Sequence, residues 1–216
     1  MTGAQKRFVD VPVGGVTLQG ELQVPADASG TVVFAHGSGS SRLSPRNNAV
    51  AETLREEGFG TFLFDLLTPE EDLDRALRFD VELLRERLVA ATEVLGETDE
   101  SAELPVGYFG ASTGAAAALR ASIGRTDVAA VVCRGGRVDL ASDVFGQVTS
   151  PTLLVVGGDD DQILELNKQA FERLTCEKEL AVVPRAGHLF ERPGALNEVT
   201  ALAVEWYGRH FARIAA

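Results

Sequence analysis

The sequence predicts an α/β protein with a mainly parallel central sheet and an antiparallel hairpin at its beginning. Short runs rich in β-branched and aromatic residues alternate with segments of helical spacing along most of the 216 residues, and this alternation is typical of parallel sheets. Runs such as TVVFA and GTFLFDL are continuously apolar, as strands buried on both faces are. The length and the hydrophobic content of 45% favour one globular domain spanning residues 1–216.

Each expected strand is a short apolar run bounded by turn residues. Gly14 and Gly15 separate the first two runs, in which apolar and polar residues alternate, and this predicts a tight hairpin. Pro151 precedes a later run, at the start of a strand where its missing N–H is tolerated. In chain order, strands are expected at residues 8–13, 16–24, 31–35, 60–66, 106–109, 128–133, 152–156 and 179–183.

The expected helices combine apolar residues at helical spacing with start and stop residues. Ser44 suits an N-cap, Pro45 fits the first helical position and Gly58 fits the end of the first helix. The longest pattern runs without interruption from Asp72 and closes at Gly96. In chain order, helices are expected at residues 44–57, 72–95, 112–123, 163–174 and 196–214, with a short helical piece at 138–143.

Composition excludes several classes of function. The chain has 20 basic and 32 acidic residues and a net charge of −12, which argues against nucleic-acid partners and anionic membrane surfaces. Two cysteines without a CxxC pair and three histidines argue against a cysteine-based metal site or a disulfide framework. The first ten residues lack the apolar stretch of a signal peptide, and no run is long enough to span a bilayer. We therefore expect a cytoplasmic protein that binds neither membrane nor nucleic acid.

The strongest motif is G-x-S-x-G at residues 110–114, between an expected strand and an expected helix. Ser112 would sit on a tight turn that only small neighbours such as Gly110 and Gly114 allow, and this context makes it a candidate nucleophile. A serine nucleophile needs a base. His188 lies in the loop after the last strand and follows the serine in chain order, whereas His36 is expected to shape the turn after the third strand.

The remaining groups of the candidate site are less sharply defined. The base needs an orienting carboxylate, and spacing alone does not choose among Asp159, Asp160 and Asp161, with Asp139 a more distant alternative. An oxyanion needs two converging N–H groups. We expect them from the backbone of Thr113, directly after the nucleophile, and of Ser38, in the HGSGSS loop after the third strand.

Arginines near the expected strand ends could hold a substrate carboxylate, because a guanidinium offers a bidentate fork. Arg42 and Arg46 follow the HGSGSS loop, and Arg134 and Arg137 follow the strand at residues 128–133. The alternative is ordinary surface pairing with nearby acidic residues. Of these arginines, we keep Arg42, Arg46 and Arg134 as candidates for substrate binding.

Taken together, the segments HGSGSS with SPRN, GASTG, GGDDDQI and AGHLF resemble those of small α/β-hydrolases of the dienelactone hydrolase-like group, over about residues 8–212. The resemblance implies an α/β-hydrolase fold with a sheet of seven or eight strands flanked by helices, and neither a metal nor an organic cofactor. In that group the acid is the fourth residue of the segment matched by GGDDDQI, which is Asp160 here. Dienelactone hydrolases proper use a cysteine nucleophile, so their specificity is not transferred to a chain with Ser112.

These observations predict a serine hydrolase that cleaves small or short-acyl carboxylic esters through an acyl-enzyme. No insertion is long enough for a large cap domain, which favours small substrates. Two alternatives remain: a thioesterase or acyltransferase with the same triad, and a non-catalytic binding module on the same fold. The sequence does not fix the oligomeric state, and a homodimer is one candidate. Small hydrolases of this kind also occur beside phosphoribosyltransferase-like domains, so the resemblance suggests such a partner.

Overall fold

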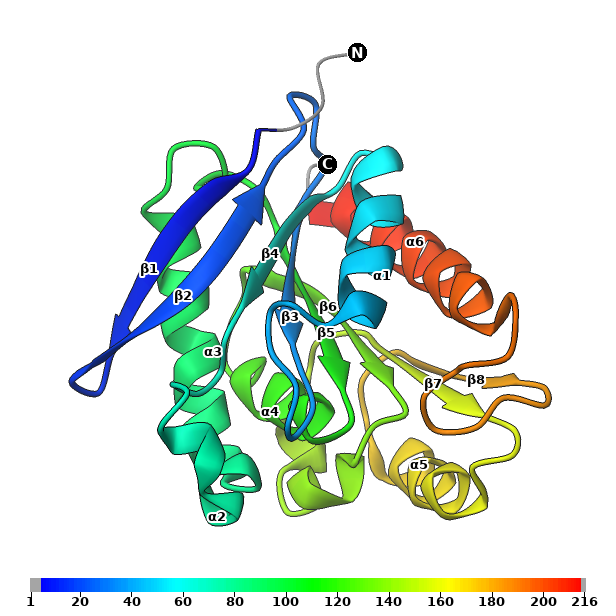
Figure 1. The fold of residues 1–216 in the computed structure, drawn as a ribbon. Helices are drawn as coiled ribbons and strands as arrows, with labels where there is room; N and C mark the ends of the chain where they lie inside the picture. The colour runs from blue at the N-terminus through cyan, green and yellow to red at the C-terminus, as the bar shows by residue number, and fades with distance from the viewer. Residues whose placement is uncertain (1–4, 215–216) are drawn as a thin grey trace.

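The computed structural model describes residues 5–214 and contains one eight-stranded sheet in the order β1-β2-β4-β3-β5-β6-β7-β8 (Figure 1). The β1–β2 and β2–β4 pairs are antiparallel, and all the other neighbours are parallel. The predicted mainly parallel sheet with an initial hairpin is thereby confirmed. The strands are β1 (Arg7–Val13), β2 (Val16–Gln23), β3 (Thr31–Ala35), β4 (Gly60–Phe64), β5 (Val106–Ala111), β6 (Val128–Arg134), β7 (Thr152–Gly157) and β8 (Lys178–Val183).

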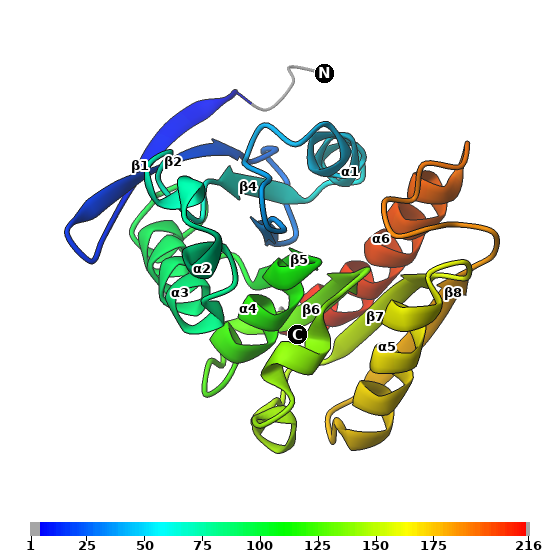
Figure 2. The ribbon, with the colours of Figure 1, turned by 60° about the horizontal axis from the view of Figure 1, so that its bottom comes forward.

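Helices cover both faces of the sheet, with α1 and α6 on one face and α3, α4 and α5 on the other (Figure 2). Each face buries its own apolar cluster between helices and sheet. The helices are α1 (Pro45–Glu56), α2 (Arg75–Arg78), α3 (Val81–Gly96), α4 (Thr113–Ala121), α5 (Asp161–Arg173) and α6 (Ala195–Ile214), with short 3-10 turns η1 (Glu71–Leu73), η2 (Val138–Ala141) and η3 (Phe145–Gln147).

The prediction of a single helix at residues 72–95 is wrong, because the structure divides this stretch into η1, α2 and α3. Two aspartates cause the division. The carboxylate of Asp74 accepts a hydrogen bond from the N–H of Ala76, and that of Asp80 accepts one from Leu83. An aspartate that bonds the backbone in this way begins a new helix. The apolar spacing continues through both breaks, which is why the pattern reads as one helix.

The remaining expected elements are all present, with ends that differ by two residues or fewer. One of these differences matters, because β6 runs on to Arg134 and thereby fixes the backbone of that residue in the sheet. Only η2 and η3 lie between β6 and β7, so no large cap covers the carboxyl ends of the strands. Within residues 5–214, no helix is both long and apolar enough to cross a membrane.

Candidate active site

The turn between β5 and α4 holds Ser112 in a strained conformation, with φ 52° and ψ −119°. Non-glycine residues rarely adopt a positive φ, and such strain is often found at functional positions. The flanking glycines are required sterically. A Cβ on Gly110 would lie 2.5 Å from the Cα of Ala115, and a Cβ on Gly114 would lie 2.1 Å from the carbonyl oxygen of Ala35. The small residues of the motif therefore let α4 pack directly against the sheet.

Backbone hydrogen bonds fix this turn to the end of β6. The N–H of Ser112 donates to the carbonyl of Arg134 at 3.2 Å, and the carbonyl of Ser112 accepts from the N–H of Arg137 at 3.0 Å. The position of Ser112 is thus set by main-chain groups.

His188 and Asp160 are brought together by the loops after β8 and β7. The Nδ1 of His188 lies 2.7 Å from the Oδ2 of Asp160. Asp160 occupies the N-cap position of α5, yet its side chain makes no capping bond and is directed to the imidazole instead. Asp161 is the first residue of α5, and Asp139 is bonded to Arg137. Of the four aspartates considered from the sequence, Asp160 is the one bonded to His188.

Close packing around His188 defines where its loop can lie. A Cβ on Gly157 would lie 2.2 Å from the carbonyl oxygen of Ala186, so the end of β7 approaches this loop directly. Arg185 and Phe190, on either side of the histidine, both have a positive φ near 55°. Strain on both sides of His188 indicates that the surrounding structure dictates the course of the loop.

Ser112 and His188 line one pocket of about 310 Å³ at the carboxyl ends of the strands. Ligands bind at this edge of parallel sheets. No acidic residue lines the pocket within the part of the chain that the structure describes. Its lining consists of Gly37, Ser38, Gly39, Ser40, Ser44, Arg46, Asn47, Ala111, Ser112, Arg134, His188 and Leu189.

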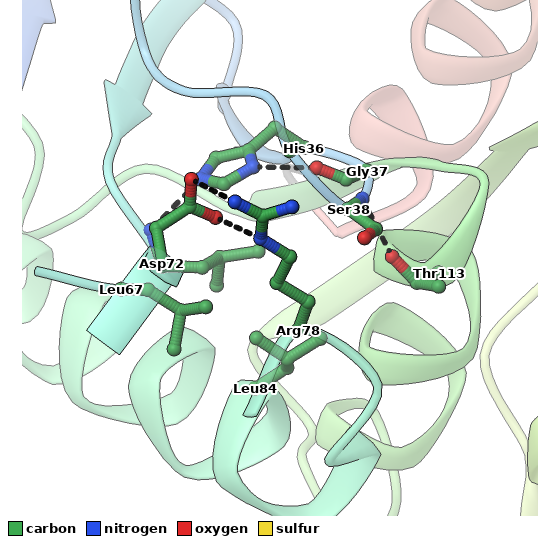
Figure 3. Close-up of a pocket in the computed structure, with 10 residues that line it drawn as sticks. His36, Gly37, Ser38, Leu67, Asp72, Arg78, Leu84 and Thr113 are labelled. Carbon is green, nitrogen blue, oxygen red and sulfur yellow. Dashed lines mark hydrogen bonds and ion pairs between the residues drawn. The ribbon is translucent and has the colours of Figure 1, made fainter. Parts of the chain in front are cut away.

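The two expected oxyanion donors lie next to each other. The backbone N–H of Ser38 donates to the Oγ1 of Thr113 at 3.0 Å (Figure 3). The backbone N–H of Thr113 belongs to the first residue of α4 and so has no partner within the helix. A Cβ on Gly37 would lie 3.0 Å from the Cβ of Ser112, so this loop approaches the serine closely. The structure therefore adds one feature that the motif does not reveal, a threonine hydroxyl that already occupies the Ser38 donor.

The imidazole of His36 holds the HGSGSS loop in place through two hydrogen bonds. Its Nδ1–H donates to the carbonyl of Gly37 at 3.0 Å, and its Nε2 accepts from the N–H of Leu66 at 2.9 Å (Figure 3). These bonds fix one tautomer, and burial lowers the pKa of the imidazole. The expectation that His36 shapes the turn is confirmed. The adjoining cavity, which Arg78 also lines, measures about 10 Å³ and is large enough for roughly one water.

The candidate arginines differ in their surroundings. Arg42 does not line the pocket, because its side chain pairs with Asp65. Arg46 lines the pocket and pairs at 3.0 Å with Glu191 on the surface. Arg134 also lines the pocket but is only 8% exposed, and it has no acidic partner within residues 5–214.

Sequence reasoning missed Asn47, a pocket residue that is 2% exposed. Its side-chain oxygen lies 3.4 Å from the Nη2 of Arg134. Two signals in the sequence could have indicated this position: its place at the end of the SPRN segment, and a polar residue among the apolar positions of the expected helix.

Neither cysteine has the surroundings of a reactive thiol. Cys133 is fully buried in β6, and burial raises the pKa of its thiol, which suppresses the reactive thiolate. Cys176 is also a free thiol, and burial raises its pKa as well. Within residues 5–214, no three histidine, cysteine, aspartate or glutamate side chains are grouped as metal ligands would be.

Comparison with known proteins gives relatives along nearly the whole chain, although no protein-family model matches it. Over 203 residues the chain is 55% identical to two Mycobacterium tuberculosis proteins provisionally named phosphoribosyl transferases, which covers 94% of this chain and 46% of each of theirs. It therefore spans about half the length of these curated relatives. A solved dienelactone hydrolase from Anabaena variabilis is 52% identical, with a TM-score of 0.93 over 96% of this chain and 99% of that one. An esterase from Pyrococcus furiosus has a TM-score of 0.81 over 96% of this chain and 92% of that one, but at 18% identity it shows the fold alone.

Proposed function

The chain belongs to the dienelactone hydrolase-like α/β-hydrolases, and from this premise we propose that it hydrolyses small carboxylic esters with Ser112 as the nucleophile. The observation that carries the proposal is the 2.7 Å contact between His188 Nδ1 and Asp160 Oδ2, beside a pocket that Ser112 and His188 both line. A serine on a strained turn, an imidazole and a carboxylate that orients it are the parts of a nucleophilic triad.

The tautomer of His188 follows from the contact of its Nδ1 with Asp160. Because the carboxylate accepts from Nδ1–H, Nε2 is left as the basic nitrogen of His188. Nε2 takes the proton of the Ser112 hydroxyl while Oγ attacks the ester carbonyl carbon. The carbon–oxygen bond to the alcohol then breaks, and Nε2 returns the proton to the leaving alcohol. Water attacks the acyl-enzyme with the help of the same base and releases the carboxylic acid and Ser112.

The negative oxygen of each tetrahedral intermediate needs donors that are already in place. The backbone N–H groups of Thr113 and Ser38 are the proposed donors. The Oγ1 of Thr113 accepts from the Ser38 N–H, so this hydroxyl must share the donor with the oxyanion or rotate away from it. Each such donor contributes about 3 kcal/mol to lowering the barrier.

The dimensions of the site favour small substrates. A pocket of about 310 Å³ lies at the lower end of the range for ligand sites, and only η2 and η3 separate β6 from β7. We therefore propose short-acyl esters as the substrate class.

The name of the Mycobacterium tuberculosis relatives describes a different chemistry. Since the chain matches 46% of each relative and carries a hydrolase-type site, we propose that the name refers to the half of those proteins that this chain does not match. A phosphoribosyltransferase-like partner of this chain, whether linked or separate, is proposed on that basis.

The direct test is hydrolysis of p-nitrophenyl acetate, butyrate and octanoate by the wild-type protein and by Ser112→Ala. We expect turnover by the wild type that falls with acyl length, and a loss of about 10³-fold or more in kcat for the variant. A fluorophosphonate probe should label the wild type at Ser112 alone. Equal activity of both proteins, or labelling that survives the substitution, would show that Ser112 is not the nucleophile.

A further inference from the structure

The strand β8 forms an open edge of the central sheet. Within residues 5–214 it has one neighbouring strand, β7, and β1 lies at the opposite end of the sheet. Helices α5 and α6 contact β8, one on each face (Figure 2). Every residue of β3, β4, β5, β6 and β7 is buried, whereas five of the six residues of β8 are at least partly exposed. The outer side of β8 is therefore accessible to another strand.

The pairing with β7 determines which backbone groups of β8 face outward. The carbonyls of Glu177 and Val183, at the two ends of β8, accept N–H groups from the β7 side. The direction of the backbone N–H and C=O groups alternates along a strand, so the odd-numbered residues face β7. The N–H and C=O groups of Lys178, Leu180 and Val182 therefore face outward. None of them bonds another part of the chain within residues 5–214.

The opposite edge of the sheet is protected in ways that β8 is not. β1 contains Pro12, which has no N–H to offer to another strand, and the charged residues Arg7 and Asp10. Proline and charged side chains are common means of preventing edge-to-edge pairing. β8 contains no proline, and its last four residues, 180–183, are all apolar. The two edges of this sheet therefore differ in their capacity to bind a further strand.

The two charged side chains of β8 are bound by helices of their own chain. The Nζ of Lys178 donates to the carbonyl of Leu174, at the end of α5, and lies 4.9 Å from the centre of the Phe171 ring. The carboxylate of Glu179 accepts from Arg209 of α6 at 2.7 Å. Both charges are thus held on the faces of the sheet, so they do not protect the outer edge as the residues of β1 do.

We propose that two copies of this chain pair through β8, antiparallel and about a two-fold axis at Leu180. In this register Leu180 lies opposite Leu180 of the second copy, and Lys178 lies opposite Val182 of the second copy. Every outward N–H and C=O of β8 then has a backbone partner. Any other axis pairs at least one of the three outward residues with a residue outside β8. The proposal does not depend on the proposed function.

The edge is complementary to itself, which is why we assign a second copy rather than an unrelated strand. The axis at Leu180 places no like charges directly opposite each other, since Lys178 lies opposite Val182 and Glu179 lies opposite Ala181 of the second copy. Two-fold dimers, which use the same surface of both subunits, are the commonest oligomers. The two eight-stranded sheets would continue through this interface as one sheet.

The first experiment tests the register with cysteines in a Cys176→Ser background, in which Cys133 is fully buried. Leu180→Cys places two thiols opposite each other at the axis, where paired residues have Cα atoms about 5.5 Å apart, a distance that suits a disulfide. We expect mild oxidation to give a covalent dimer on a denaturing, non-reducing gel. The matched control is Val182→Cys, whose two thiols would lie about 13 Å apart along the strands and should not be linked.

The second experiment measures the association by analytical ultracentrifugation. The wild type should approach twice its monomer mass of 23.0 kDa as its concentration rises. Val182→Pro removes an outward N–H that has no partner in its own strand pair, so the fold should persist while the dissociation constant rises by about 10-fold or more. Val182→Lys places a charge opposite Lys178 of the second copy and should also weaken the dimer. Circular dichroism checks that both variants are folded.

The control for the ultracentrifugation is Phe8→Lys, at a residue of β1 that is 70% exposed. This variant should keep the wild-type dissociation constant within about 2-fold. A wild type that stays monomeric throughout the micromolar range would overturn the proposal. A dimer that neither Val182 variant weakens would also overturn it, because the copies would then meet at another surface. Equal cross-linking of Leu180→Cys and Val182→Cys would refute the register.

Discussion

The contact between α4 and β3 predicts that Gly114→Ala damages both stability and activity. The new Cβ would lie 2.1 Å from the carbonyl oxygen of Ala35 and 2.7 Å from that of His36. Both are backbone atoms, so α4 or the end of β3 must move by on the order of 1 Å to restore normal contact. Such overpacking typically costs about 1–3 kcal/mol, which alanine's better helix propensity offsets by up to about 1 kcal/mol.

The same displacement affects the chemistry, because α4 begins directly after Ser112 and the oxyanion loop directly after His36. A misplacement of about 1 Å near reacting groups can lower the rate by roughly 100-fold. We therefore expect Gly114→Ala to lower the Tm by about 2–8 °C and kcat/KM for p-nitrophenyl butyrate by about 100-fold.

Gly208→Ala provides the matched control for this experiment. Gly208 lies in α6, and a Cβ there would meet no atom within 4 Å. The identical substitution should therefore stabilise the protein, by about 0.5–1 kcal/mol, since alanine favours the helix. Thermal unfolding followed by circular dichroism measures both variants. A Gly114→Ala protein with wild-type Tm and activity would refute the steric reasoning.

Two further predictions concern the histidines and their partners. Asp160→Asn should lower kcat by about 10⁴-fold, because an amide no longer favours the required tautomer of His188; Asp161→Asn should stay within a few-fold, and equal losses in both would contradict the assignment. The lowered pKa of buried His36 means that the unfolded state binds more protons below about pH 6.5, so stability should fall as the pH drops from about 6.5 to 5. Urea unfolding over this range should show that the free energy of unfolding depends less on pH in His36→Gln than in the wild type. An unchanged pH dependence would exclude His36 as the cause of the loss of stability. His210, whose pKa is also lowered, contributes in the same direction.

Sequence patterns predicted those features of the fold that short stretches of chain determine. The strand ends and helix starts follow from residues such as Ser44, whose hydroxyl accepts from Asn47 as an N-cap should, and from glycines that allow tight turns. The break of the long helix at Asp74 and Asp80 was missed because the same residues are also common on exposed helix faces.

The site was predictable where a motif has a steric cause, and not where it depends on distant partners. Gly110 and Gly114 indicated the position of Ser112 because only glycine fits there. Spacing alone could not separate the three adjacent aspartates, since only the fold decides which carboxylate meets the loop of His188. Arg42 and Arg134 look alike in the sequence, and the difference between them comes from Asp65, which pairs with one of them only.

The proposed triad is distributed along the chain in a way that affects synthesis. Ser112 follows β5, whereas Asp160 and His188 follow β7 and β8, and the last two are 28 residues apart. During translation the proposed nucleophile is therefore made before the proposed base. On the proposed assignment, a nascent chain that has not yet added β7 and β8 carries Ser112 without the base that would activate it.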